Sequence, residues 1–217
     1  MGSVLVRSLQ DLHSSPNIEA KRYQMKIVAI SDLHGKLPDN VPECDLLLIG
    51  GDICPDYRKN KEMEQLKWYE KDFKHWLDAQ KAGNVVLTWG NHDWVGQFAP
   101  ENRWARKSTS ANVLVDEETT VNGLRIWGSP WQPRFYDWAF NLDEPELEKK
   151  WELIPEGIDI LLLHGPPHGY GDLAPSYGRS KEPAIHVGSP SLTKAIERVR
   201  PLHSSVRCHV PHGDCGG

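Results

Sequence analysis

The sequence predicts an α/β fold built on buried parallel strands, and three observations support this prediction. Four short apolar runs are continuous rather than alternating, which is typical of strands buried on both faces of a parallel sheet. A segment with helical periodicity lies between the second and third runs. Each run ends in a residue that can bind a metal ion, beside a glycine. The runs cover residues 26–31, 45–50, 84–89 and 159–164.

Length and composition limit the class of protein. The chain has 217 residues, enough for one domain with a sizeable core. Its formal net charge of −5 gives no general signal for nucleic-acid binding. No apolar stretch is long enough to span a bilayer, and the N-terminus has no signal-peptide pattern. The four cysteines form no C-x-x-C pair, so we expect no disulfide framework and a cytoplasmic location.

The first 24 residues show no periodicity, so we expect a poorly ordered extension before a domain that covers residues 25–202. The first helix is expected to begin after Asn60, as its N-cap, and to end at Gly83. Its apolar stripe is expected to pack on the core rather than to bind a cofactor. The stripe consists of Leu66, Tyr69, Phe73, Trp76 and Leu77.

Four further elements are expected along the second half of the chain. Asn122-Gly123 joins two short runs and is a strong signal for a hairpin. Helices are expected at residues 144–153 and 190–199. The loop at residues 128–142 is rich in Trp, Pro and Phe, and long aromatic loops often line a binding site.

The residues that end the four runs point to a metal site. Asp32 and His34 lie on one side of an extended segment, because side chains alternate along it. A carboxylate with an imidazole suits Mn, Fe, Zn or Co better than Mg or Ca. Asp52 can bridge two cations through its two oxygens, while Asn91 and His164 add an amide oxygen and an imidazole. Because ligands gather at the carboxyl ends of strands in open α/β sheets, we expect these side chains to converge.

Two metal ions about 3.5–4 Å apart form a centre that hydrolyses phosphoesters. His92, beside Asn91, can protonate the leaving group or bind a phosphate oxygen, and Asp93 can orient its imidazole. Taken singly, each motif is explained as well by a turn or a cap. Four such motifs in order, each closing a buried strand, favour the metal centre.

The same motifs resemble the successive signature blocks of the calcineurin-like metallophosphoesterase superfamily. These blocks are Asp32-Leu33-His34, Gly51-Asp52, Gly90-Asn91-His92-Asp93 and His164-Gly165-Pro166-Pro167. The aromatic loop is similar to one in the branch of small metallophosphoesterase-domain-containing proteins, and the resemblance covers about residues 25–201. It implies a four-layer αββα sandwich of two mixed β-sheets flanked by helices, around a dinuclear metal centre.

The resemblance also implies a role for each ligand. Asp32 and His34 would hold the first of two divalent metal ions, and Asp52 would bridge the two. Asn91 and His164 would hold the second ion. The identity of the ions, among Mn, Fe, Zn and Co, stays open.

Three other residues are candidates for contacts with substrate. The resemblance makes His92 the catalytic histidine. His168 follows the Gly-Pro-Pro turn, and Arg134 lies in the aromatic loop, where a guanidinium suits a phosphate oxygen. For His168 the sequence favours an ordinary surface loop, and for Arg134 an ordinary surface charge explains the sequence at least as well.

The segment at residues 203–217 departs from the family pattern. The family supplies Gly-His-x-His, one histidine for each metal ion, and then closing strands that are missing here. In this chain His209 and His212 are separated by Val210-Pro211, and no apolar strand precedes them. Three interpretations stay open: a frameshifted or mis-spliced end, histidines that bind the metals with altered geometry, or a tail that binds nothing. The first metal site is therefore expected to be the weaker one.

The expected function is hydrolysis of a small phosphoester by metal-activated hydroxide. A phosphodiester such as a cyclic nucleotide is expected only from the branch resemblance. A phosphomonoesterase or protein phosphatase is one alternative. A catalytically weakened nucleotide-binding or scaffold protein is another, motivated by the altered tail. The sequence leaves the oligomeric state open and indicates neither a membrane nor a nucleic-acid partner.

Overall fold

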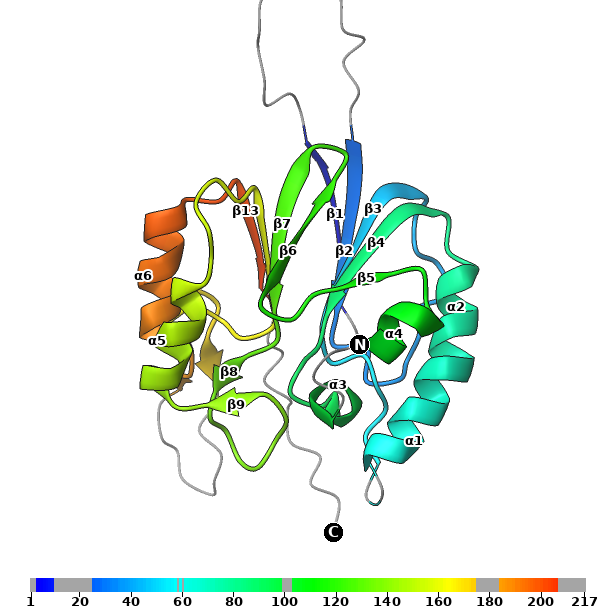
Figure 1. Ribbon diagram of the computed structural model, residues 1–217, viewed down its shortest axis with the longest axis horizontal. Coiled ribbons are helices and arrows are strands. Elements are labelled where there is room, and N and C mark those ends of the chain that lie inside the picture. Colours follow the sequence, from blue (N-terminus) through cyan, green and yellow to red (C-terminus); the bar gives the residue numbers. More distant parts are fainter. Residues whose placement is uncertain are drawn as a thin grey trace, which may run out of the picture.

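Two main β-sheets lie side by side in this computed structural model, with helices on their outer sides (Figure 1). The structure describes residues 3–9, 25–57, 59, 61–98, 103–174 and 184–206. Parallel strands and helices make this a mixed α/β fold, as the apolar runs predicted. No helix within these ranges is long and apolar enough to cross a membrane.

The first sheet has five strands in the order β1-β2-β3-β4-β5. Its strands are β1 (Ser3–Leu9), β2 (Met25–Ser31), β3 (Cys44–Gly50), β4 (Ala82–Thr88) and β5 (Asn112–Val113). Strands β2 to β5 pair in parallel, and the first three of these contain the first three apolar runs, except that Trp89 follows the end of β4. Their side chains are largely buried because both faces of the sheet are covered.

Strand β1 lies within the N-terminal segment, residues 1–24, for which we expected a poorly ordered extension. Residues Ser3–Leu9 pair antiparallel with β2, and residues 10–24 lie outside the described part of the chain. The free edge of β2 offers a row of N–H and C=O groups to any extended segment that reaches it. Pairing of this kind depends on backbone groups, so hydrophobic periodicity does not reveal it.

The second sheet has four strands in the order β13-β10-β7-β6. Its strands are β6 (Glu117–Val121), β7 (Leu124–Ser129), β10 (Ile160–Leu163) and β13 (His203–Val206). Strands β6 and β7 form the predicted hairpin, with φ of 49° at Asn122 and 85° at Gly123. Strand β10, the fourth apolar run, pairs in parallel with β7 and β13. A strand therefore does precede His209, although its sequence is polar.

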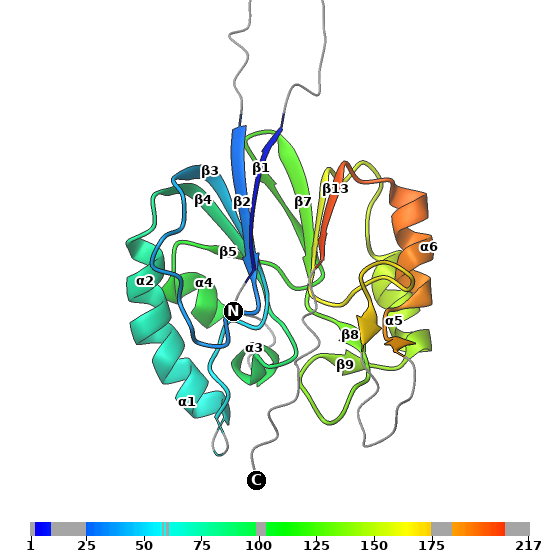
Figure 2. The same cartoon turned by 180° about the vertical axis from the view of Figure 1, so that it is seen from behind.

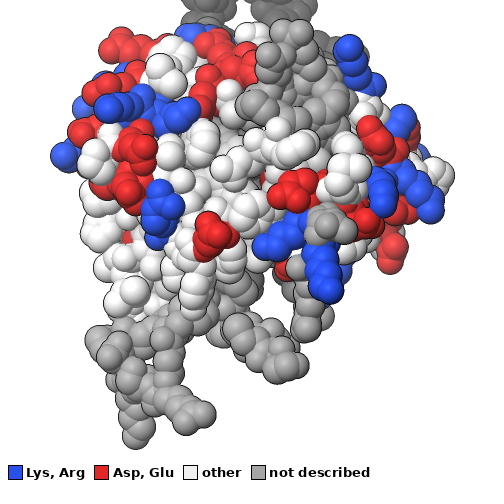
Figure 3. All heavy atoms as spheres, turned by 60° about the horizontal axis from the view of Figure 1, so that its bottom comes forward, with Lys and Arg blue, Asp and Glu red and all other residues white. Residues whose placement is uncertain are grey.

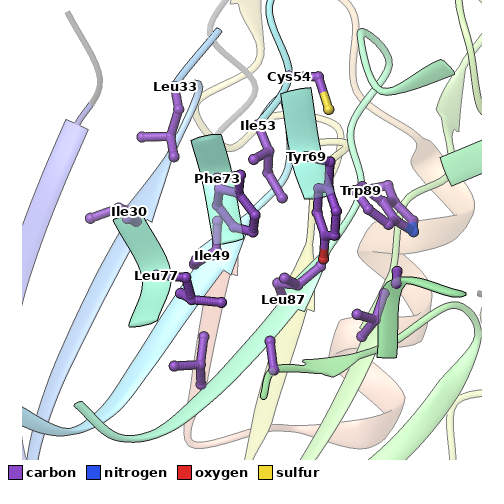
Figure 4. Close-up of a cluster of buried hydrophobic side chains, with 14 of the residues drawn as sticks. Ile30, Leu33, Ile49, Ile53, Cys54, Tyr69, Phe73, Leu77, Leu87 and Trp89 are labelled. Carbon is purple, nitrogen blue, oxygen red and sulfur yellow. The ribbon is translucent and has the colours of Figure 1, made fainter. Parts of the chain in front are cut away.

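A bent helical segment covers the outer face of the first sheet. It consists of α1 (Lys61–Trp68), a π-helical turn η1 (Tyr69–Phe73) and α2 (Lys74–Asp78). Tyr69, Phe73 and Leu77 point from it toward the sheet, as Figure 4 shows. The helix ends at Asp78 rather than at the predicted Gly83, which lies in β4. A Cβ on Gly83 would come within 2.9 Å of the Asp45 carbonyl oxygen, so glycine serves the close strand pairing there.

Two helices cover the outer face of the second sheet, as Figure 2 shows from behind. They are α5 (Glu144–Glu152) and α6 (Pro190–Val199), close to their predicted bounds. Asp143 and Glu146 form a capping box at the start of α5. Short helices α3 (Trp94–Phe98) and α4 (Arg103–Ser108) complete the first half.

A third apolar cluster lies between the two sheets. It brings Leu46 and Leu48 of the first sheet against Ile126 and Leu162 of the second. Because the two sheets pack in this way, the loops that follow β3 and β10 meet at one edge, the lower edge in Figure 1. Four short strands lie in the remaining loops: β8 (Gln132–Pro133), β9 (Asn141–Leu142), β11 (Leu173–Ala174) and β12 (Ile185–His186).

Candidate metal centre

The loops that follow β2 and β3 are held together by three backbone hydrogen bonds. The N–H groups of Asp32, His34 and Gly35 donate to the carbonyl oxygens of the β3 loop at 3.0, 2.8 and 2.9 Å. Asp32, His34 and Asp52 adopt left-handed φ values of 56°, 45° and 51°. The segment from Asp32 to His34 is therefore a turn after β2, and not the extended segment with alternating side chains that we expected. A left-handed conformation costs a non-glycine residue about 1–3 kcal/mol and is typical of functional sites. The backbone therefore holds three of the expected ligands in strained positions.

Asp52 lies between two imidazoles. Its Oδ2 is 3.6 Å from Nε2 of His34, and its Oδ1 is 3.4 Å from Nε2 of His164. Oδ1 also accepts a hydrogen bond of 2.8 Å from the N–H of His92. Asp32, His34 and Asp52 each offer one ligand atom within 4.8 Å of the others. The two oxygens of Asp52 thus face different sides of the centre.

His164 and Asn91 form the second side. His164 is fully buried, and its Nδ1 donates to the carbonyl oxygen of Gly50 at 2.9 Å. Its Nε2 lies 2.8 Å from Oδ1 of Asn91. With Nδ1 donating to Gly50, an Oδ1 atom at this distance accepts a hydrogen bond if Nε2 is also protonated, and the same pair of atoms is suited to hold one cation. Burial lowers the pKa of His164, but the charges of Asp52 and Asp32 outweigh it and raise the pKa.

Asp93 connects two loops rather than orienting His92. Its carboxylate is fully buried and accepts hydrogen bonds from the N–H groups of Ile53, Cys54 and Gly90 at 2.9, 2.8 and 2.8 Å. Burial, together with the charge of Asp52, raises the pKa of Asp93 to about 6. The carboxylate of Asp93 points at backbone N–H groups. It therefore does not make the expected contact with the imidazole of His92.

Asp56 is the partner of His92, and no motif in the sequence marks it. Oδ1 of Asp56 lies 2.6 Å from Nδ1 of His92. Burial lowers the pKa of His92, but this hydrogen bond and the charge of Asp52 raise it overall. Asp56 also lies 3.6 Å from Nδ1 of His34, and the three residues form a second potential ligand group. Its position after Pro55 carries no spacing signal that could have revealed it.

The aromatic loop lies against the centre. The ring of Trp138 is 4.4 Å from that of His92, and Phe135 and Tyr136 contact Trp138 at 5.3 and 5.7 Å. The N–H of Ala139 donates to the carbonyl oxygen of Asn91 at 3.0 Å. The loop is therefore tied to the backbone of an expected ligand, with Tyr136 65% exposed beside it.

The remaining expected residues lie elsewhere. Arg134 is exposed, and its Nε donates to Oδ1 of Asp143 at 2.7 Å. His168 belongs to a separate group with Asp172 and His186. His209 and His212 lie outside the described residues.

Figure 3 looks toward the edge of the sheets where these loops lie. On this face the described Lys and Arg residues are interspersed with Asp and Glu on two sides, and the area between them is mainly uncharged. The Lys and Arg residues visible in this view do not form a single basic patch of the kind that binds a polyanion. Binding of a ligand at this edge of the sheets would therefore depend on contacts with side chains of the individual loops.

Comparison with known proteins identifies relatives of the chain. The family model "Calcineurin-like phosphoesterase" matches residues 25–187. The chain is 34% identical to "Metallophosphoesterase domain-containing protein 1" of Homo sapiens, over 87% of this chain and 61% of that protein. It is 40% identical to "UPF0046 protein T07D4.2" of Caenorhabditis elegans, over 87% of this chain and 52% of that protein.

The chain spans less than two thirds of the length of these two relatives. A solved crystal structure shares the fold with a TM-score of 0.51 and 16% identity, over 86% of this chain and 84% of that chain. The family model extends from the start of β2 to the segment just after β12, and so includes all the loops described above. The chain therefore belongs to the calcineurin-like phosphoesterase family.

Proposed function

We propose that this protein hydrolyses phosphoesters at a dinuclear metal centre. The observation that carries the proposal is the position of Asp52, whose two oxygens lie 3.6 and 3.4 Å from imidazoles of different loops. A carboxylate that faces two imidazoles in this way is suited to bridge two cations. The strained backbone at Asp32, His34 and Asp52 supports a functional origin for the arrangement.

Each expected ligand has a place in this proposal. Asp32 and His34 would hold one divalent ion and Asn91 and His164 the other, with Asp52 between them. When bound, the two ions would supply a water of lowered pKa and neutralise charge on the phosphate. Completion of the ligand set by His209 and His212 stays a prediction, which the metal content of a H209A/H212A variant would test.

His92 would act on the leaving group. Asp56 holds its Nδ1 at 2.6 Å, which fixes the orientation of the ring. Nε2 can then donate a proton to the oxygen that leaves the phosphorus. The hydrogen bond to Asp56 raises the pKa of His92, which favours the protonated ring that a general acid needs.

A small phosphodiester with an aromatic group, such as a cyclic nucleotide, is the proposed substrate. The ring of Trp138 packs against His92 at an interplanar angle of 51°, and the exposed Tyr136 contacts Trp138. Planar bases stack favourably on such side chains. Phosphate contacts by Arg134 and His168 stay predictions. The two packed sheets, with helices outside, support the four-layer αββα arrangement.

The test compares bis-p-nitrophenyl phosphate with p-nitrophenyl phosphate, on one preparation supplied in turn with Mn²⁺, Fe²⁺, Zn²⁺ or Co²⁺. We expect the diester to be hydrolysed faster, and we expect D52N to lose at least about 100-fold in kcat/KM. D72N, which changes an exposed carboxylate in η1, is the matched control and should keep full activity.

Three outcomes would count against parts of this proposal. Faster hydrolysis of the monoester would contradict the diester preference and favour a phosphomonoesterase. Tight nucleotide binding without turnover would favour a scaffold or binding protein. Absence of turnover with every metal, in protein that contains two ions per chain, would contradict the proposed hydrolysis.

A further inference from the structure

A second group of metal-ligating side chains lies outside the candidate dinuclear centre. It consists of His168, Asp172 and His186, whose ligand atoms all lie within 4.8 Å of one another. His168 belongs to the loop after β10, and His186 to β12, which pairs with β11. The strands β11 and β12 are the short gold and orange arrows in Figure 2.

Asp172 is the centre of this group. Its side chain is 1% exposed, whereas those of His168 and His186 are 48% and 45% exposed. Nδ1 of His186 lies 2.7 Å from Oδ1, and Nδ1 of His168 lies 3.6 Å from Oδ2. A buried carboxylate with two half-exposed imidazoles leaves the group open to solvent on one side.

The carboxylate of Asp172 is held in its ionised form. Burial raises its pKa, but hydrogen bonds from His186 and from the N–H groups of Gly169 and Gly188 outweigh this and lower it. The bond from Gly188 to Oδ2 measures 3.1 Å. The ring centroids of His168 and His186 are 4.9 Å apart, and the rings meet edge to face. Both imidazoles therefore lie on the same carboxylate, that of Asp172.

Backbone hydrogen bonds hold together the chain segments that carry the three side chains. The N–H of His168 donates to the Ser189 carbonyl at 3.1 Å, and the N–H of Val187 to the Asp172 carbonyl at 3.0 Å. A Cβ on Gly188 would come within 2.6 Å of the Pro167 carbonyl carbon, so the two segments pack at the limit of contact. A ligand set held in this way loses little entropy when an ion binds.

We propose that His168, Asp172 and His186 bind one zinc ion at a site separate from the dinuclear centre. Two imidazole nitrogens, one carboxylate oxygen and an open fourth position form a donor set that zinc prefers. Tetrahedral zinc with bonds of about 2.0–2.1 Å places neighbouring ligand atoms about 3.3 Å apart. The separations of 2.7 and 3.6 Å involve different oxygens of Asp172, and one ligand atom from each of the three residues lies within 4.8 Å of the others. Side-chain movements would bring the three donors to the spacing that one zinc ion requires.

The test measures zinc binding directly, without any activity assay. The chelator-treated protein, with all 217 residues, is dialysed against zinc chloride, and the zinc content per chain is measured by elemental mass spectrometry. We expect H168A and H186A each to hold one zinc ion fewer than the wild type, or to bind that ion at least about tenfold more weakly. Both imidazoles are half exposed, so their removal should leave the fold intact, which circular dichroism checks.

The control H75A removes an exposed histidine of α2 and should keep the full zinc content. The same comparison in a D52N background separates this site from the dinuclear centre, because the two share no residue. Loss of one zinc ion in both backgrounds would support the proposal even if phosphoester hydrolysis were not found. Equal zinc content and equal affinity in the wild type, H168A and H186A would overturn it.

Discussion

At the scale of single residues, Asp52 controls the protonation of its neighbours. Its charge raises the pKa of His92, Asp93 and His164, while burial acts against the charged form of each of the three groups. The folded protein thus binds protons more tightly at these groups than the unfolded chain does. Metal ions bind the deprotonated ligands, so they compete with these protons.

The raised pKa values of these three groups predict how the stability of the metal-free protein depends on pH. Groups with a raised pKa in the folded state stabilise it below their unfolded pKa, and this contribution is lost as pH rises through the folded pKa. The free energy of unfolding should therefore fall as pH rises from about 5 to 8. Urea unfolding at several pH values measures it, and D52N should show a smaller fall. A stability that rises over this range in the wild type would contradict the prediction.

Asp56 provides a second prediction at this scale. D56N removes the charge that faces Nδ1 of His92, so the pKa of His92 should fall and its ring should lose its fixed orientation. We expect kcat to fall by about 10–100-fold, with unchanged metal content. The alkaline limb of the pH–rate profile should move to lower pH, because a general acid must be protonated. An unchanged profile, with loss of bound metal, would instead make Asp56 a ligand.

At the scale of elements, the hairpin between β6 and β7 depends on its turn. Gly123 has φ of 85°, a region that alanine enters only at a cost. We expect G123A to lower the free energy of unfolding by about 1 kcal/mol, whereas G123N should cost less, because asparagine tolerates this region. Chemical denaturation compares the two variants. Equal losses in G123A and G123N would show that φ is not the cause.

Elements with strong local signals were predictable from the sequence, and the others depend on distant partners. The buried runs, the Asn122-Gly123 turn and helix α6 all carry periodicity, turn or cap signals in their own residues. Strands β1 and β13 form because a sheet edge accepts their backbone, which no local pattern records. Asp56 is the same case within the site, since its contact with His92 depends on how the β3 loop folds.

At the scale of the whole molecule, the two sheets are held together by the apolar cluster between them. Leu46 is fully buried there, and L46A should destabilise the protein by about 2–5 kcal/mol because it leaves a cavity. M63A, at a side chain that is 51% exposed, is the control and should change stability little. Urea unfolding followed by fluorescence and circular dichroism measures both. Similar losses in the two variants would contradict a shared core.

The hydrogen bond from Ala139 to the carbonyl of Asn91 has a thermodynamic consequence. Any molecule that orders the aromatic loop also restricts the loop that carries Asn91, and the reverse holds as well. Allosteric coupling between two sites is reciprocal, so both affinities must change by the same factor. Metal binding at the centre and binding of an aromatic ligand at the loop would then be thermodynamically coupled, so that each changes the affinity of the protein for the other.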